Sequence, residues 1–194
     1  MKRLFLGLAV LCAGCGGSSG IRHPSAAYKG AQLSPPIPVK SFTLADKTGA
    51  RAGLAARPGH YVILTFLYTH CPDVCPIIAG NLNTALRSPV ARRAALQVVA
   101  VSVDPRRDTL AAVRNYVREH RLLPSFRYLI GSRKQLASVW RAYHVAALAG
   151  AKGTVAHTAI EFLIDPAGRE VLTYGSDVQA AWVLHDLKLL EGSS

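Results

Sequence analysis

Two nearly continuous runs of apolar residues mark the strands expected at the centre of this protein. Residues 61–68 (YVILTFLY) and 96–103 (LQVVAVSV) are rich in β-branched and aromatic side chains, with few polar interruptions. This composition is typical of strands buried on both faces of a sheet. Shorter runs predict further strands at 42–44 and 126–130.

The segments between these strands show the apolar periodicity of helices. Residues 76–86 predict a helix directly after the first apolar run. Residues 109–120 predict a second helix, with Leu110, Val113 and Val117 on one face. Each long strand is therefore followed by a helix before the next strand begins.

Two pairs of residues at capping-box spacing mark the expected starts of later helices. Ser132 stands three residues before Gln135, and Ser176 stands three residues before Gln179. In such a box the Ser hydroxyl and the Gln side chain each satisfy a backbone N–H of the first helical turn. The second box predicts a last helix that runs through Leu190.

The fold class follows from the order of these elements. Segments 158–164 and 170–174, joined by an Asp-Pro-Ala-Gly turn, predict a hairpin. Alternating strands and helices followed by a hairpin and a helix imply parallel strand pairs with an antiparallel edge. We predict an α/β protein, a thioredoxin-like sandwich with a mixed central sheet and flanking helices over residues 41–194. Another small doubly wound α/β fold is the alternative.

The first residues have the anatomy of an export signal. Lys2 and Arg3 precede an apolar stretch at 4–11, which is too short for an ordinary membrane span, and small residues follow up to Cys15. The segment resembles a bacterial lipoprotein signal, although Cys12 stands where Leu is usual. We predict a signal peptide at 1–14, lipid attachment to Cys15, and an extracytoplasmic domain on a Gly/Ser/Pro-rich tether at 15–40. An ordinary cleaved signal or an uncleaved anchor is the alternative.

Composition and charge narrow the classes of molecule that this protein is expected to bind. Among 194 residues, half are hydrophobic, which is enough for a core, and the formal net charge is +12. The basic residues form no long run interleaved with aromatics, so nucleic acid is disfavoured against an anionic membrane surface or an acidic protein. Removal of residues 1–14 leaves 21 basic and 11 acidic residues, three cysteines and no methionine.

The strongest chemical motif is the pair Cys71 and Cys75 in the sequence CPDVCP. The motif lies between a predicted buried strand and a predicted helix, where sites form in α/β sheets and where the helix N-terminus lowers thiol pKa values. The four-residue spacing lets both sulfurs meet one metal ion or each other. A disulfide and a metal site both fit, and thioredoxin-type redox motifs have one residue fewer between the cysteines.

Two thiolates need a third ligand to form a soft metal site. Of the seven histidines, His144 and His157 remain as candidates, and His157 starts the strand that passes the cysteines in a thioredoxin-like topology. Two sulfurs and one imidazole suit Cu(I), and with further ligation Cu(II). Zinc is the competitor, with its fourth ligand from water or a carboxylate such as Asp73.

Three sequence blocks resemble those of the Sco/SenC family. They are YTHCPDVCP at 68–76, VSVDP at 101–105 with RDT at 107–109, and HTA at 157–159 followed by FLIDPAGR at 162–169. Many members carry Asp before the histidine, whereas this chain has Ala156. The resemblance runs from about residue 42 to the last helix, in the family's order and spacing.

The resemblance implies a function and a set of ligands. Family members bind copper through two cysteines and a histidine, here Cys71, Cys75 and His157, with Asp73 close by. They assist assembly of the binuclear copper A centre of cytochrome c oxidase. The expected function is an extracytoplasmic copper metallochaperone rather than an enzyme, anchored to the membrane by lipid. Its partner is the copper A-bearing oxidase subunit or another exported copper protein. The alternatives are a thiol–disulfide reductase, which would use the Cys71–Cys75 disulfide, and a redox or copper sensor.

Overall fold

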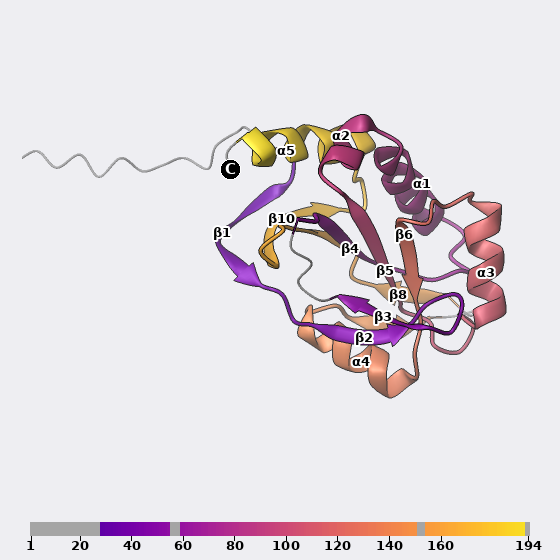
Figure 1. Cartoon of the computed structure of the whole chain (residues 1–194). Coiled ribbons are helices and arrows are strands. Elements are labelled where there is room, and N and C mark those ends of the chain that lie inside the picture. The colour runs from indigo at the N-terminus through magenta and orange to yellow at the C-terminus, as the bar shows by residue number, and fades with distance from the viewer. Residues whose placement is uncertain (1–27, 55–58, 151–153, 193–194) are drawn as a thin grey trace, which may run out of the picture.

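A six-stranded mixed sheet runs through the centre of the molecule (Figure 1). The computed structural model describes residues 28–54, 59–150 and 154–192. In spatial order the strands are β1 (Ala31–Pro38), β10 (Arg169–Gly175), β9 (Ile160–Ile164), β4 (Val62–Leu67), β5 (Gln97–Ser102) and β6 (Phe126–Leu129). β4, β5 and β6 pair in parallel, and the other pairs are antiparallel, which confirms the predicted mixed sheet.

Helices cover both sides of this sheet. They are α1 (Val74–Leu86), α2 (Pro89–Arg93), α3 (Leu110–Glu119), α4 (Arg133–Ala142) and α5 (Ala180–Gly192). In Figure 1, α1, α2 and α5 lie together with α3 beyond them, and α4 lies on the opposite side of the sheet. None of the helices in the described ranges combines the length and the apolar character of a membrane span.

Two small hairpins lie outside the central sheet. β2 (Phe42–Ala45) pairs with β3 (Arg51–Leu54), and Ala45 bridges to Ile130 at the end of β6. β7 (Ala147–Ala149) pairs with β8 (Val155–His157) between α4 and β9. The sequence indicated the first strand of the first hairpin only. The second hairpin carries His157, one of the predicted metal ligands.

The predicted tether at 15–40 is wrong for its last part. Residues 31–38 form β1, which pairs antiparallel with β10 at the edge of the sheet. Prolines are tolerated at sheet edges and irregularities, and the register shifts between Gln32 and Ile37, where the Ser-Pro-Pro sequence lies. Asp186 of α5 also accepts hydrogen bonds from the backbone N–H groups of Lys29 and Gly30. The predicted signal peptide, Cys15 and tether residues up to 27 lie outside the described residues.

One of the two predicted capping boxes forms. The Ser132 hydroxyl accepts the N–H of Gln135, and the Gln135 side chain accepts the N–H of Ser132, ahead of α4. The box at Ser176 is not a helix start, because α5 begins only at Ala180. The predicted helix is nevertheless present and continues to Gly192.

A carboxyl group lies unexpectedly in the middle of the core. Glu161 of β9 is 1% exposed, and its Oε1 accepts one long hydrogen bond of 3.4 Å from the Thr65 hydroxyl of β4. Its Oε2 is buried without a hydrogen-bond partner. Burial therefore raises the pKa of Glu161 to about 8, so the group is protonated at neutral pH.

This carboxyl group makes stability depend on pH. A raised carboxyl pKa favours folding below the ordinary value of 4.5, and this contribution is lost as pH rises toward about 8. Glu161→Gln mimics the protonated form and cannot ionise. We expect a variant whose unfolding free energy changes less between pH 5 and pH 8. At pH 8 it should exceed the wild type by on the order of 2–4 kcal/mol.

Urea unfolding of the reduced, metal-free protein at both pH values measures this difference. Glu119→Gln is the matched control. It makes the same substitution at an exposed position of α3, where the carboxyl group is not buried. Parallel pH profiles for the wild type and Glu161→Gln would show that Glu161 is ionised throughout and would contradict the prediction.

Candidate metal centre

Cys71 and Cys75 lie where β4 leaves the sheet and α1 begins. A turn closed by the Cys71 N–H donating to the Tyr68 carbonyl places Cys71 three residues before the first residue of α1. Cys75 is the second residue of that helix. Both are free thiols; Cys71 is 9% exposed and Cys75 is fully buried. The sequence therefore predicts their common position correctly, although only Cys75 belongs to the helix.

The two thiols differ strongly in acidity. Burial raises the pKa of Cys71, but hydrogen bonds from the Cys75 thiol and from the backbone N–H groups of Asp73 and Cys75 outweigh this and lower it. Burial raises the pKa of Cys75, and its hydrogen bond to Cys71 raises it further. The expectation that the helix N-terminus activates both cysteines is thus wrong for Cys75. Its thiol keeps its proton and donates it toward the Cys71 sulfur.

His157 brings a nitrogen to the cysteine pair from β8. Its Nε2 lies 3.9 Å from the Cys75 sulfur, and its Nδ1 lies 3.0 Å from the Thr158 carbonyl. A carbonyl only accepts, so Nδ1 carries the proton and Nε2 presents its lone pair toward Cys75. Burial lowers the pKa of His157, which keeps the ring neutral at neutral pH. A neutral imidazole held through its other nitrogen is the form that binds metals.

The spacing between Cys75 and His157 suits a shared ion. Bonds of about 2.3 Å to sulfur and 2.0 Å to nitrogen, as measured for zinc, separate the two ligand atoms by about 3.7–3.9 Å when they meet at 120–130°. The observed 3.9 Å agrees with this separation. In this conformation, no three Cys, His, Asp or Glu side chains of the described residues are grouped closely enough to enclose an ion. Cys75 thus lies between His157 and Cys71, whose sulfur accepts a hydrogen bond from the Cys75 backbone N–H at 3.4 Å.

A shallow pocket of about 320 Å³ opens Cys71 and His157 to solvent, whereas Cys75 does not line it. It is lined by Tyr68, Cys71, Pro72, Asp73, Val74, Thr154, Val155, Ala156, His157 and Ala159. Asp73 is exposed and its side chain makes no capping hydrogen bond to α1, so a role for its carboxylate remains a prediction. His144, the other candidate, follows α4 and does not line this pocket.

Tyr68 connects the cysteine turn to the hairpin that carries His157. Its hydroxyl accepts a hydrogen bond from the backbone of Val155 and donates one to Cys71, and burial raises its pKa. Its ring also packs edge-on against His157, with 6.0 Å between centroids. Tyr68 opens the motif at 68–76, but the sequence of that motif gives no sign of this role.

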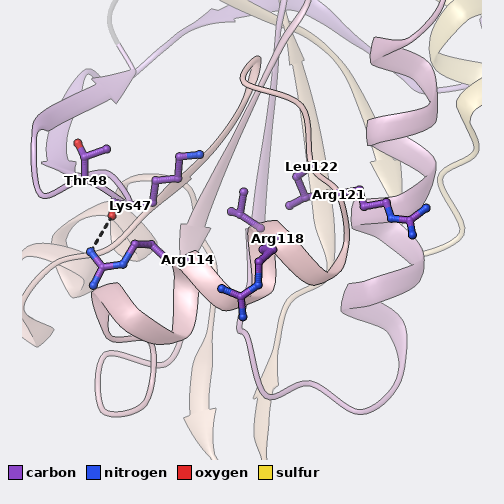
Figure 2. A pocket seen from close by; sticks show the side chains of 7 residues that line it. Lys47, Thr48, Arg114, Arg118, Arg121 and Leu122 are labelled. Atoms are coloured by element: carbon purple, nitrogen blue, oxygen red, sulfur yellow. Dashed lines mark hydrogen bonds between the residues drawn. The ribbon is translucent and has the colours of Figure 1, made fainter.

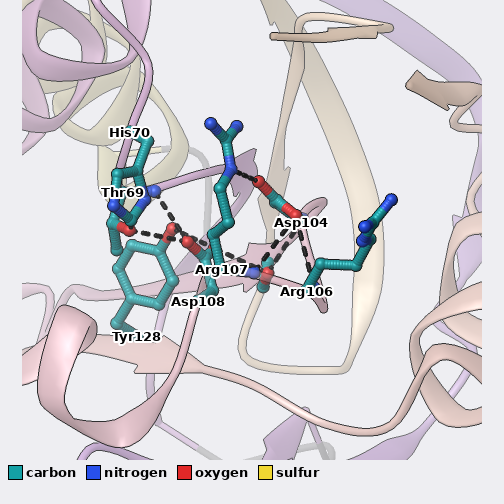
Figure 3. A network of polar contacts seen from close by, with 8 residues as sticks. Thr69, His70, Asp104, Arg106, Arg107, Asp108 and Tyr128 are labelled. Carbon is teal, nitrogen blue, oxygen red and sulfur yellow. Dashed lines mark hydrogen bonds and ion pairs between the residues drawn. The ribbon is translucent and has the colours of Figure 1, made fainter. Parts of the chain in front are cut away.

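Below the turn, a buried carboxylate holds the segment that precedes Cys71 (Figure 3). Asp108, which is 4% exposed, accepts the backbone N–H and the hydroxyl of Thr69 at 2.9 and 2.7 Å. Its second oxygen accepts the hydroxyls of Ser102 at 2.6 Å and Tyr128 at 3.1 Å. The Thr69 hydroxyl oxygen lies 2.9 Å from Nδ1 of His70. One carboxylate thus ties the turn to the ends of β5 and β6.

Asp104, in the loop between β5 and α3 that also contains Asp108, acts on Tyr68 through an arginine. Asp104 forms an ion pair with Arg107, whose guanidinium lies 5.9 Å from the centre of the Tyr68 ring. Asp104 and Arg107 also line a neighbouring pocket together with Thr154 and Val155 of the His157 hairpin. The block at 101–109 therefore supports the metal centre from below. Its sequence alone showed similarity to a family but not this role.

Asp108 should be the residue whose loss most disturbs the cysteine turn. Asp108→Asn replaces an acceptor oxygen with an NH₂ donor that faces hydroxyl and N–H donors. We expect a loss of about 2–4 kcal/mol in unfolding free energy, since hydrogen bonds to buried charged groups contribute about 1.5–3 kcal/mol each. Amide NMR shifts of residues 69–71 should change together.

Ser102→Ala is the matched control, because it removes one of the four hydrogen bonds and leaves both bonds to Thr69. Urea unfolding and amide NMR of the reduced protein compare the variants. Unaltered shifts at residues 69–71 in Asp108→Asn would show that the turn holds its shape without this carboxylate.

The chain matches the family model described as SCO1/SenC over residues 31–190. A "Protein SCO2 homolog, mitochondrial" from Bos taurus is 36% identical over 134 residues, which are 66% of this chain and 50% of that protein. The chain thus spans about half the length of this curated relative.

Solved structures agree with the sequence match. "Crystal structure of Arabidopsis thaliana ScoI with copper bound" superposes with a TM-score of 0.70 at 30% identity, covering 80% of this chain and 99% of the other. "Solution structures of apo Sco1 protein from Thermus Thermophilus" gives 0.71 at 31% identity, covering 87% and 99%. The predicted thioredoxin-like fold and the resemblance noted above are confirmed, and the chain belongs to the SCO1/SenC family.

Proposed function

We propose that this protein is a copper metallochaperone that binds one ion through Cys71, Cys75 and His157. The observation that carries the proposal is the 3.9 Å approach of the neutral His157 nitrogen to the Cys75 sulfur, with Cys71 in the same pocket. Two sulfurs and one imidazole form the soft donor set that copper prefers. A similar Sco structure from Arabidopsis thaliana was solved with copper bound.

Each ligand has a distinct task in taking up the ion. Cys71 offers the first thiolate, because its hydrogen bonds favour the charged form. Cys75 has to lose its proton as the ion binds, so binding releases a proton from the buried side of the site. His157 needs no deprotonation at neutral pH, because its Nε2 lone pair already faces Cys75. Tyr68 and Asp108 hold the turn in position while the ligands close.

The protein binds copper and hands it on without catalytic turnover. The acceptor is the copper A-bearing subunit of cytochrome c oxidase or another exported copper protein. The pocket supports transfer by direct contact because it is shallow and places Cys71 and His157 at its lining. A disulfide between the two cysteines would remove both thiolates, which makes the redox state of the pair a gate for binding.

Substitutions of the ligands should distinguish the two oxidation states of copper. His157→Ala leaves two soft thiolates, which suffice for Cu(I), whereas Cu(II) prefers more ligands including imidazole nitrogen. We expect His157→Ala to weaken Cu(II) binding far more than Cu(I) binding. Cys71→Ser and Cys75→Ser should weaken both. Competition titration against chelators in each oxidation state measures these affinities.

His144→Ala is the control, because His144 lies outside the pocket. The reduced wild type should bind one copper ion per chain, and the oxidised protein should bind almost none. Equal losses of Cu(I) and Cu(II) affinity in His157→Ala would refute the prediction that His157 matters more for Cu(II). No loss of affinity in either oxidation state would exclude His157 from the site. Reduction of exported disulfides by protein that purifies without copper would favour a thiol–disulfide reductase.

We also propose that the domain works outside the cytoplasm on a lipid anchor at Cys15. The order of basic, apolar and small residues at 2–15 supports this location. Mass spectrometry of the protein from a bacterial expression host should show an N-terminus at Cys15 with attached acyl chains. Cys15→Ala should abolish this modification and release the domain from the membrane fraction. An unmodified terminus, or one at another residue, refutes the lipid anchor.

A further inference from the structure

The folded protein hides much of its negative charge. Of its 11 Asp and Glu side chains, six are buried. They are Asp104, Asp108, Glu161, Asp165, Glu170 and Asp186. The surface is therefore more one-sidedly basic than the formal net charge of +12 conveys.

Several positive side chains line a groove beside α3 (Figure 2). The groove has a volume of about 770 Å³ and is lined by Lys47, Thr48, Arg114, Val117, Arg118, Arg121 and Leu122. Four of these seven residues are cations, and none is acidic. Val117 and Leu122 are each 8% exposed and form apolar parts of the lining. We call this feature the α3 groove.

The four cations of the α3 groove lack internal counterions. In the part of the chain that the structure describes, no carboxylate lies within ion-pair distance of them. Arginines elsewhere do pair, as Arg93 does with Glu191 and Arg169 with Asp165. Asp46 is close in sequence, but one of its carboxylate oxygens accepts the N–H and the hydroxyl of Thr48. The groove therefore presents charge that only another molecule can neutralise.

The backbone around the groove is held in place. Arg121 adopts a left-handed conformation with φ 49° at the end of α3. Its carbonyl accepts hydrogen bonds from the Asn83 side chain at 3.1 Å and from Arg87 at 3.3 Å. The Arg114 guanidinium also donates to the Lys47 carbonyl across the groove at 3.5 Å. The Arg114 bond links α3 to the loop that contains Lys47. The bonds to the Arg121 carbonyl link the end of α3 to α1.

The α3 groove and the metal centre are connected through one helix. The opposite side of α3 contributes Ala112, Asn115, Tyr116 and Glu119 to a small pocket that also includes Thr69 and His70. These two residues directly precede Cys71. A partner bound in the α3 groove can therefore reach across α3 to the turn that precedes Cys71.

We propose that the α3 groove docks an acidic, extended segment of the protein that exchanges copper with this domain. The groove is concave and has apolar parts, which suits a chain segment that carries carboxylates and some apolar side chains. A flat membrane surface fits it poorly, and α3 lies across the molecule from β1, where the described chain begins (Figure 1). This inference rests on the proposed function, because the partner is the one that the metal centre serves.

The test uses a ten-residue glutamate peptide as the acidic probe. It is titrated into the reduced, metal-free domain in low salt and followed by amide NMR. Shifts should cluster at residues 47–48 and 114–122 and should weaken steeply with added salt. The variant Arg114→Gln/Arg118→Gln should bind the peptide at least about fivefold more weakly.

Arg133→Gln/Arg141→Gln on α4 is the matched control. It removes the same charge from exposed arginines of another helix, and we expect less than a twofold change. An equal loss in both variants, or shifts spread evenly over the surface, would mean that only net charge matters and would overturn the proposal. Vesicles of phosphatidylglycerol form a second arm. If they bind through the α3 arginines more tightly than the peptide does, the groove is a membrane surface and the proposal fails.

A third arm separates this proposal from the proposed function. Copper stoichiometry of the Arg114→Gln/Arg118→Gln variant should equal that of the wild type, whereas its rate of copper transfer to an isolated copper A domain should fall and lose its salt dependence. A wild type that binds no copper refutes the metallochaperone but leaves the peptide result valid. Normal copper binding with transfer unaffected by the α3 variant refutes the docking surface alone.

Discussion

The hydrogen bonds accepted by Asp108 are the constraint on which the metal centre depends. Cys71 belongs to no helix or strand, so its position is determined by the turn that leads to it. Asp108 holds that turn by two bonds to Thr69 and is itself held by hydroxyls from β5 and β6. Because these strands lie side by side in parallel, their ends form a rigid platform for the carboxylate. The turn that carries Cys71 is thus anchored to the central sheet.

Burial of carboxyl groups links the interior of this protein to its surface. A buried carboxylate is costly unless donors surround it, and Asp108 and Asp186 each accept several hydrogen bonds. Glu161 has too few donors around it, and it avoids the cost of a buried negative charge by retaining its proton. Among the described residues, Asp108, Glu161 and Asp186 form no ion pair with an arginine, unlike the buried Asp104 and Asp165. Their burial therefore leaves fewer carboxylates at the surface, and the cations of the α3 groove have no ion-pair partner among the described residues.

Local patterns made most of the fold predictable. β4 and β5 were visible as apolar runs, and α4 through its capping box, since these signals reside within a few residues. β1 was missed because its prolines indicate a tether, and only the pairing with β10 reveals a strand. The short β7–β8 hairpin also has no periodicity to detect. The approach of His157 to Cys75 was expected from topology and resemblance, whereas the supporting bonds of Asp108 and Tyr68 join residues far apart in sequence.

The unequal burial of the two cysteines determines the order in which a second molecule can reach the ligands. Helix dipole arguments treat both thiols alike, but Cys75 is fully enclosed whereas Cys71 and His157 line the open pocket. In the copper site proposed above, an incoming ligand would therefore meet Cys71 or His157 first, and the Cys75 sulfur last. Burial raises the pKa of Cys75, so in the proposed site this thiol would lose a proton when an ion binds and regain it when the ion leaves. In that site, departure of the ion would be coupled to reprotonation of the buried thiol, so protons would compete with the metal for Cys75.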